Sequence, residues 1–182
     1  VTGQSTVLAI SPDGARFMAG FTLYDVSTLS ILGQMNNANA PFPFTAAFNT
    51  RQNIGGSVFS PDGKTLYVAL GGNNCVAVLD SSDGHVRGLI PTDWYPGALL
   101  LQGDTLLSAN VKGIGSMNES REDMRKRLSE HLKHVVKPGN YFNSHYALGS
   151  VSFIPLPDAK TLEDYTYQVA ENMRLPFVNE TM

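Results

Sequence analysis

Short apolar segments alternate with tight polar turns along most of the chain. Residues 9–19 contain two apolar segments on either side of Ser-Pro-Asp-Gly, and the same arrangement returns 49 positions later in residues 58–69. A degenerate third copy, residues 101–110, follows the second by 40 positions. Each copy predicts a β-hairpin, because Pro sets φ in the turn, Asp bonds its own backbone and Gly supplies a positive φ.

A second apolar pattern follows each of these hairpins. Residues 21–33, 75–90 and 149–166 each begin with an apolar strand, pass through small polar residues and return as another strand. Two hairpins in about 40 to 50 residues make a unit of the size of a propeller blade. The sequence therefore predicts an all-β fold of about three four-stranded antiparallel β-propeller blades. In the first unit no linker separates Gly20 from Phe21, so a shortened hairpin is expected there.

The number of blades raises the question of closure. Propellers close with about 4 to 8 blades, and three blades leave two apolar sheet faces open. We therefore interpret residues 1–182 as a single partial propeller domain that belongs to a larger propeller. The alternatives are a ring completed by self-association and an open stack capped by the segments outside the repeat.

Composition supports a turn-rich β protein and excludes several classes. Charged residues make up 16% of the chain, against roughly 25% in ordinary soluble domains, and apolar residues make up 42%. A net charge of −3 gives no attraction to nucleic acid or to an anionic membrane. No apolar run is long enough for a membrane span, and residues 1–10 lack the pattern of a signal peptide. The single cysteine, Cys75, excludes an internal disulfide and is interpreted as a small core residue.

Two segments interrupt the repeat. Residues 36–53 form a long connection whose aromatic residues are expected to cover a blade edge or, alternatively, to line a groove at the propeller mouth. Residues 117–147 predict an amphipathic helix inserted within the third blade, capped by Ser120 and stopped at Pro138. The basic side chains of this helix are interpreted as a solvated face.

Histidines in this insertion are the candidates for a metal site. His131 and His134 are three positions apart and could face one ion, with Glu130 or His145 added. Their order differs from the zincin motif, in which the glutamate lies between the histidines. We interpret them as exposed helix residues, and we predict no catalytic, cofactor-binding or metal-binding residue in this chain.

At the level of families, residues 60–69, 76–80 and 88–91 resemble the YVTN-type β-propeller repeat, and the resemblance covers residues 54–116. Residues 91–96, 110–116, 149–157 and 165–169 resemble the propeller that precedes an alkaline-phosphatase-superfamily phosphoesterase domain in secreted bacterial proteins. This resemblance implies a periplasmic or extracellular protein. It also implies a divalent-metal catalytic domain beyond residue 182, so no active-site residue is carried over to this chain. Gly97 stands where such repeats often have Thr, and the third copy lacks Ser-Pro.

Three functions remain open. The first is a noncatalytic propeller segment that acts as scaffold or binding surface of a larger secreted protein, with the remaining blades as partners. The second is the N-terminal part of a metal-dependent phosphoesterase, with its C-terminal phosphoesterase domain as partner. The third is a lactonase-like propeller enzyme, which would need ligands from Asn73, Asn74, Asp93 and Asn110. The candidate binding residues are Trp94, Tyr95 and Lys112, and Trp94 is expected to be buried near a blade interface.

Overall fold

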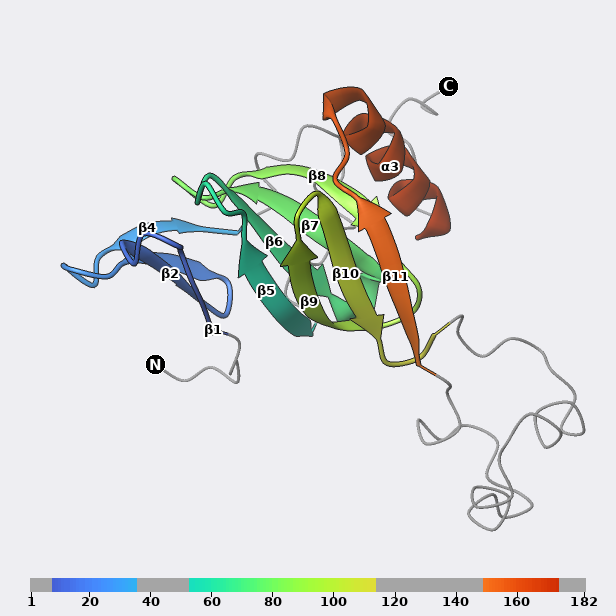
Figure 1. Ribbon diagram of the computed structural model, residues 1–182, viewed down its shortest axis with the longest axis horizontal. Coiled ribbons are helices and arrows are strands. Elements are labelled where there is room, and N and C mark those ends of the chain that lie inside the picture. The colour runs from blue at the N-terminus through green and yellow to red at the C-terminus, as the bar shows by residue number, and fades with distance from the viewer. Residues whose placement is uncertain (1–7, 36–52, 114–148, 174–182) are drawn as a thin grey trace, which may run out of the picture.

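The computed structural model describes residues 8–35, 53–113 and 149–173, and the structural statements below concern those residues (Figure 1). They form three antiparallel sheets whose strands follow one another in chain order. Sheet 1 contains β1 (Leu8–Ile10), β2 (Arg16–Ala19), β3 (Thr22–Asp25) and β4 (Ile31–Gln34). Sheet 2 contains β5 (Ile54–Phe59), β6 (Thr65–Leu70), β7 (Cys75–Asp80) and β8 (Val86–Pro91). Sheet 3 contains β9 (Pro96–Gln102), β10 (Thr105–Asn110) and β11 (Ser150–Pro155).

The Ser-Pro-Asp-Gly turns are the same in sheets 1 and 2. In sheet 1 the Ser11 hydroxyl donates to the Asp13 carboxylate at 2.5 Å, and the Gly14 N–H donates to the Ser11 carbonyl at 2.9 Å. In sheet 2 the Ser60 hydroxyl donates to the Asp62 carboxylate at 2.6 Å. The glycine of each turn has φ +69°, which a side chain would disfavour. The repeat in the sequence is thus a repeat of hairpins, as predicted.

The first strands of successive sheets lie side by side, β1 next to β5 and β5 next to β9. The approach of β9 to β5 depends on two glycines. A Cβ on Gly55 would lie 2.6 Å from the Pro96 carbonyl oxygen, and a Cβ on Gly56 would lie 2.8 Å from the Leu99 nitrogen. Sheets joined at their first strands and stacked face to face are the blades of a β-propeller. The predicted all-β propeller fold is confirmed, with four strands in two blades and three described strands in the third.

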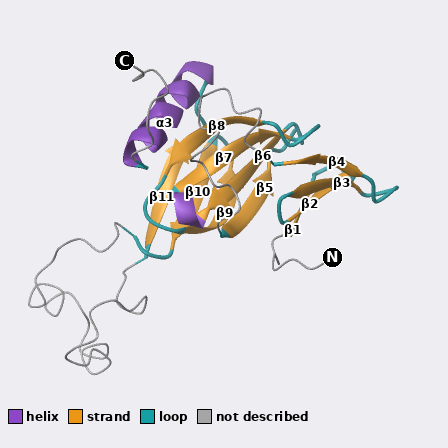
Figure 2. Ribbon diagram, turned by 180° about the vertical axis from the view of Figure 1, so that it is seen from behind, coloured by secondary structure: helices purple, strands orange, loops and turns teal. Residues whose placement is uncertain are grey.

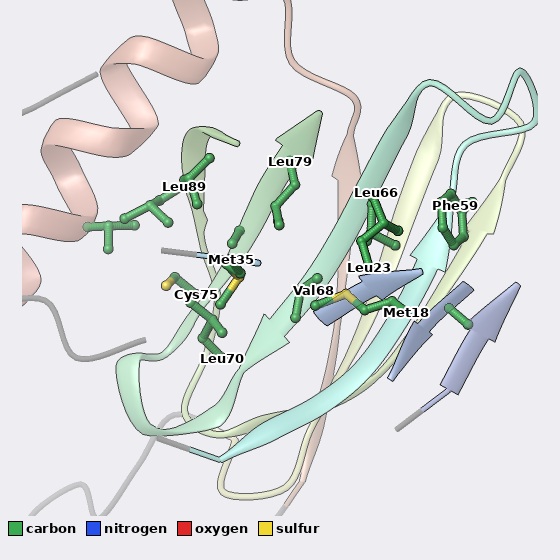
Figure 3. Close-up of a cluster of buried hydrophobic side chains, with 14 of the residues drawn as sticks. Met18, Leu23, Met35, Phe59, Leu66, Val68, Leu70, Cys75, Leu79 and Leu89 are labelled. Atoms are coloured by element: carbon green, nitrogen blue, oxygen red, sulfur yellow. The ribbon is translucent and has the colours of Figure 1, made fainter. Parts of the chain in front are cut away.

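Sheet 2 lies between the other two sheets and packs with both faces, since alternate residues of a strand point to opposite faces. Leu66 and Val68 of β6 lie beside Leu23 and Met18 of sheet 1, and Leu70 belongs to the same buried cluster (Figure 3). On the opposite face, a second cluster joins sheet 2 to sheet 3 through Tyr67, Val76, Val78, Ile90, Leu106 and Ile154. Cys75 is fully buried in the first cluster, which confirms it as a core residue.

One prediction about the third blade is wrong. The pattern in residues 149–166 predicts a strand, a turn and a second strand, but only β11 forms, and α3 (Ala159–Asn172) follows it. The Asp158 carboxylate accepts a hydrogen bond from the Thr161 N–H at 2.8 Å and so caps the helix. Thr166, Val169 and Ala170 are buried at helical spacing against sheet 2, and α3 lies along β8 in both views (Figures 1 and 2).

Two connections complete the comparison with the sequence. β2 and β3 are joined by the two residues Gly20 and Phe21, with Gly20 at φ +61°, so the shortened hairpin is confirmed. Residues 111–149 connect β10 to β11, which pair directly in sheet 3. The helix predicted within 117–147 and the connection 36–53, except Asn53, lie outside the described residues.

Candidate functional site

Three connections meet at one end of sheets 2 and 3, and we call their residues the rim: 71–74, 92–95 and 111–113. The Tyr95 N–H donates to the Asn74 side-chain oxygen at 2.9 Å, and the Thr92 N–H donates to the Asn74 carbonyl at 3.1 Å. Beyond β10, the Lys112 N–H donates to the Trp94 carbonyl at 3.1 Å. These bonds tie the β6–β7 turn, the β8–β9 connection and the end of β10 into one surface.

Tyr95 and Lys112 are brought together on the rim. The Lys112 Nζ lies 4.8 Å from the centroid of the Tyr95 ring, a cation–π contact that contributes about 0.5–1 kcal/mol at an exposed site. Tyr95 has φ +61°, an unusual value for a residue with a bulky side chain. Its ring fits against Gly71, where a Cβ would lie 3.2 Å from the Tyr95 Cε1. The position of the Tyr95 ring is therefore fixed by its unusual backbone conformation, by the hydrogen bond from its N–H to Asn74, and by the space that Gly71 leaves beside it.

Trp94 does not occupy the buried position that the sequence predicted. Its side chain is 46% exposed, although its backbone pairs with Lys112 and Gly113. The prediction correctly placed the residue between two blades, but the side chain leaves the interface for the rim. Trp94, Tyr95 and Lys112 therefore share one surface, and their role as binding residues stays a prediction.

A buried polar network lies behind the rim. The Asn110 amide is 2% exposed and donates to the Ser150 and Ser152 hydroxyls at 3.2 and 2.9 Å. The Ser150 hydroxyl donates to the Asp93 carboxylate at 2.6 Å, and the Ser108 hydroxyl donates to the Asn110 oxygen at 3.0 Å. Sequence reasoning missed the three serines. The sequence signal was the i, i+2 spacing of Ser150 and Ser152 on one strand and of Ser108 and Asn110 on the other, which places each pair on one face of its strand.

The four residues proposed as lactonase-type ligands have separate partners. Asp93 and Asn110 belong to the polar network, while Asn74 binds the Tyr95 backbone. Asn73 is buried, its amide nitrogen lies 3.8 Å from the Met173 sulfur, and its oxygen has no hydrogen-bond partner in the described structure. Within the described ranges no three His, Cys, Asp or Glu side chains could hold a metal ion together. His131, His134 and His145 lie outside those ranges.

The two terminal sheets each present an apolar outer face. In sheet 1 a row of side chains in register crosses all four strands, with Phe17 and Tyr24 stacked at 4.9 Å between ring centroids. This row consists of Ile10, Phe17, Tyr24 and Ile31, and Ile10 is 60% exposed. In sheet 3 two rows carry no charged residue, and Phe153 is 70% exposed. They consist of Leu100, Leu107 and Phe153, and of Ala98, Ala109 and Val151.

Comparisons with known proteins bear on the fold alone. No family model matches the chain, and no curated protein matches it. Similar solved structures include the β-propeller domain of Cps50 (Swd1) from Myceliophteria thermophila, at 16% identity and a TM-score of 0.47, which covers 60% of this chain and 34% of that one. A luciferin-regenerating enzyme is 16% identical at a TM-score of 0.46, and the match covers 83% of this chain and 44% of that one. Kuenenia stuttgartiensis hydrazine synthase is 20% identical at 0.44, with 60% and 31% covered.

The chain spans less than half the length of each of these proteins. The similarities are too distant to carry a function to this chain. The assignment as propeller blades rests on the strand order and on the packing of sheet on sheet described above. Among the described helices, none is long and apolar enough to cross a membrane.

Proposed function

We propose that this chain is a noncatalytic β-propeller segment that acts as a scaffold, holding further sheets of a larger assembly against its two ends. The observation that supports this is the apolar character of the outer faces of sheets 1 and 3. Sheet 2 carries side chains of the same kind on both of its faces and buries them. The terminal sheets leave Ile10, Ile31, Leu100 and Phe153 exposed.

Energetics favour covering these faces. Burying one Val, Leu, Ile or Phe side chain fully contributes about 1.5–3 kcal/mol. Each outer face therefore offers several kcal/mol to a partner sheet, a large amount beside the ordinary stability of a domain of about 5–15 kcal/mol. A propeller closes only when such faces are covered all round the ring.

The rim supplies the binding surface of this scaffold. It combines a half-exposed indole with an ammonium group stacked on a fixed phenol ring. Because the polar network holds the β8–β9 connection from behind, the surface is preorganised and little conformational freedom is lost when a partner binds.

The test combines light scattering, an environment-sensitive apolar dye and hydrolysis assays on residues 1–182. We expect self-association or dye binding, and no hydrolysis of phosphate esters or lactones with or without added zinc, calcium or manganese. Where dye binds, Phe153→Ser should reduce its fluorescence more than Leu29→Ser. Leu29 is the matched control because it is 68% exposed but lies in the β3–β4 turn, outside the paired rows of the outer faces.

Two results would contradict the proposal. A compact monomer that binds no dye would show that the faces are not open. Metal-dependent turnover that is lost on changing His131 or His134 would show that the chain is an enzyme.

A second candidate is the N-terminal part of a metal-dependent phosphoesterase, supported by the family resemblance of residues 91–96 and 165–169. Residues 165–169 lie within α3, which packs along β8, so a domain that follows α3 would begin beside the edge of sheet 2. Activity in a longer parent protein, absent from residues 1–182, would support this candidate and would leave the scaffold role of the propeller intact. An inactive parent protein would contradict it.

A further inference from the structure

The repeated strand of each blade shows which side chain meets which neighbouring sheet. Aligning β2, β6 and β10 through their turns gives two sets of equivalent residues. We call Phe17, Leu66 and Leu106 the backward positions, and Met18, Tyr67 and Leu107 the forward positions.

Within the chain, the two kinds of position have fixed partners. Backward residue Leu66 packs toward sheet 1, and backward residue Leu106 packs toward sheet 2, so each meets the preceding sheet. Forward residues Met18 and Tyr67 pack toward sheets 2 and 3, so each meets the following sheet. Both contacts between the described sheets thus join a forward face to a backward face.

The two open faces are one of each kind. The outer face of sheet 1 carries backward residue Phe17, and the outer face of sheet 3 carries forward residue Leu107. The rows of side chains described above are apolar on both open faces, so no charged side chain in them has to lose its water when the two faces meet. One open face therefore has the composition and orientation that the other requires.

The first strand of sheet 3 also has room for another sheet. β5 pairs with β6 in the same way as β9 pairs with β10. In these two pairings Gly55 and Gly56 of β5 occupy the same places as Gly97 and Ala98 of β9. The two glycines of β5 let β9 come close, since a Cβ on either of them would lie within 3 Å of a β9 backbone atom. Ala98 is exposed, so β9 offers a place of the same kind with no described strand against it.

We infer that the outer face of sheet 3 binds the outer face of sheet 1 of a second copy of this chain. This rests on the proposed scaffold function and names its partner. The contact is head to tail, so two copies present two such contacts, and the three described sheets of each copy together complete a ring of six. Six lies within the range of about 4 to 8 blades in which propellers close.

Mass determination by light scattering on the full 182-residue chain tests the ring. We expect a dimer with twice the 19.7 kDa of one chain. Phe153→Asp and Ile31→Asp each put an unpaired charge into the contact and should raise the dissociation constant about 100-fold or more, giving folded monomers. Leu29→Asp is the matched control and should stay dimeric. Circular dichroism and thermal unfolding check that each variant folds.

Mixing the two monomeric variants gives the decisive result. A Phe153→Asp chain keeps its sheet 1 face and an Ile31→Asp chain keeps its sheet 3 face, so one intact contact remains and mixed dimers should form. An Ile31→Asp variant that stays dimeric would overturn the inference, because it would mean that sheet 3 faces pair with each other. Open-ended polymers of the wild-type chain would overturn the closed ring.

The remaining outcomes separate this inference from the proposed function. A wild-type monomer that binds the apolar dye would overturn the second copy as the occupant and leave the scaffold proposal standing, with the faces open to other sheets. A monomer that binds no dye would overturn both.

Discussion

Thr166 in α3 accepts a hydrogen bond from the backbone N–H of Leu89 in β8, at 2.9 Å, although 77 positions separate the two residues. The same hydroxyl donates to the Leu162 carbonyl at 2.6 Å. β8 is the last described strand of sheet 2, and its outer backbone groups have no strand to pair with in the described part of the chain. The helix therefore supplies a partner that the edge of the sheet lacks.

Replacing this threonine tests how much the contact stabilises. Thr166→Val keeps the shape of the side chain but leaves the buried Leu89 N–H without a partner. We expect the free energy of unfolding to fall by about 1–3 kcal/mol, measured by urea denaturation. Gln168→Ala, on the exposed side of α3, should change it by no more than about 0.5 kcal/mol. Equal losses for the two variants would contradict the assignment.

Arg16 links sheets 1 and 2 through their turns. Its guanidinium donates to the Ser81 carbonyl and hydroxyl at 3.0 and 2.9 Å and to the Gly63 carbonyl at 3.1 Å. Arg16→Gln should lower the free energy of unfolding by about 1.5–3 kcal/mol, because bonds from a charged donor are strong and Ser81 is buried.

Arg87 provides the comparison for Arg16. It forms an ion pair with Asp80 on the surface of sheet 2, with both side chains partly exposed. Because exposed ion pairs contribute little, Arg87→Gln should cost less than about 1 kcal/mol in the same denaturation experiment. A larger loss for Arg87→Gln than for Arg16→Gln would reverse the ranking that the structure gives.

The free energy of unfolding should decrease at low pH because of Asp80. Hydrogen bonds from the Ser82 hydroxyl and N–H, and then Arg87, lower the pKa of Asp80 from 3.8 to about 2. A carboxyl with a lowered pKa in the folded state stabilises the fold above pH 3.8, and this contribution is lost as the pH falls through about 2. The thermal midpoint of Asp80→Asn should fall less steeply than that of wild type over this window. Parallel curves would show that Asp80 makes no such contribution.

Trp94 is the one tryptophan of the chain, so its fluorescence reports the rim without interference. Because the side chain is 46% exposed, acrylamide should quench its emission readily in the native state. Trp94→Ala should cost about 1 kcal/mol, below the 3–5 kcal/mol of a tryptophan in a core. A blue-shifted emission that resists quenching would place the indole in a blade interface, as the sequence first suggested.

Local chemistry explains which parts of the fold were predictable. The hairpins at residues 11–16 and 60–65 are determined by hydrogen bonds within six residues and by one glycine each. Alternation then assigns faces, since Leu66 and Tyr67 pack on opposite sides of sheet 2. Both kinds of information are present in short stretches of sequence.

The parts that were missed depend on distant residues. Leu162, Tyr165 and Val169 recur at helical spacing, not at the alternating spacing of a strand, and α3 buries Val169 and Ala170 beside β8. Gly88 makes this possible, since a Cβ there would lie 2.7 Å from the Leu162 Cγ. Asn110 likewise meets Ser150 from 40 positions away. Nothing in either segment alone reveals such contacts.

The pairing of β10 with β11 has a consequence for how the chain folds. β9 and β10 are joined by a two-residue turn, but the Asn110 and Ser150 partners are 40 positions apart. Because the entropy of loop closure rises by about 0.6 kcal/mol for each doubling of length, the longer loop costs a few kcal/mol more to close. We therefore expect the β9–β10 hairpin to form early, and β11 and α3 to join after the transition state. Mutations in β11 and α3 should then speed unfolding and leave the folding rate almost unchanged.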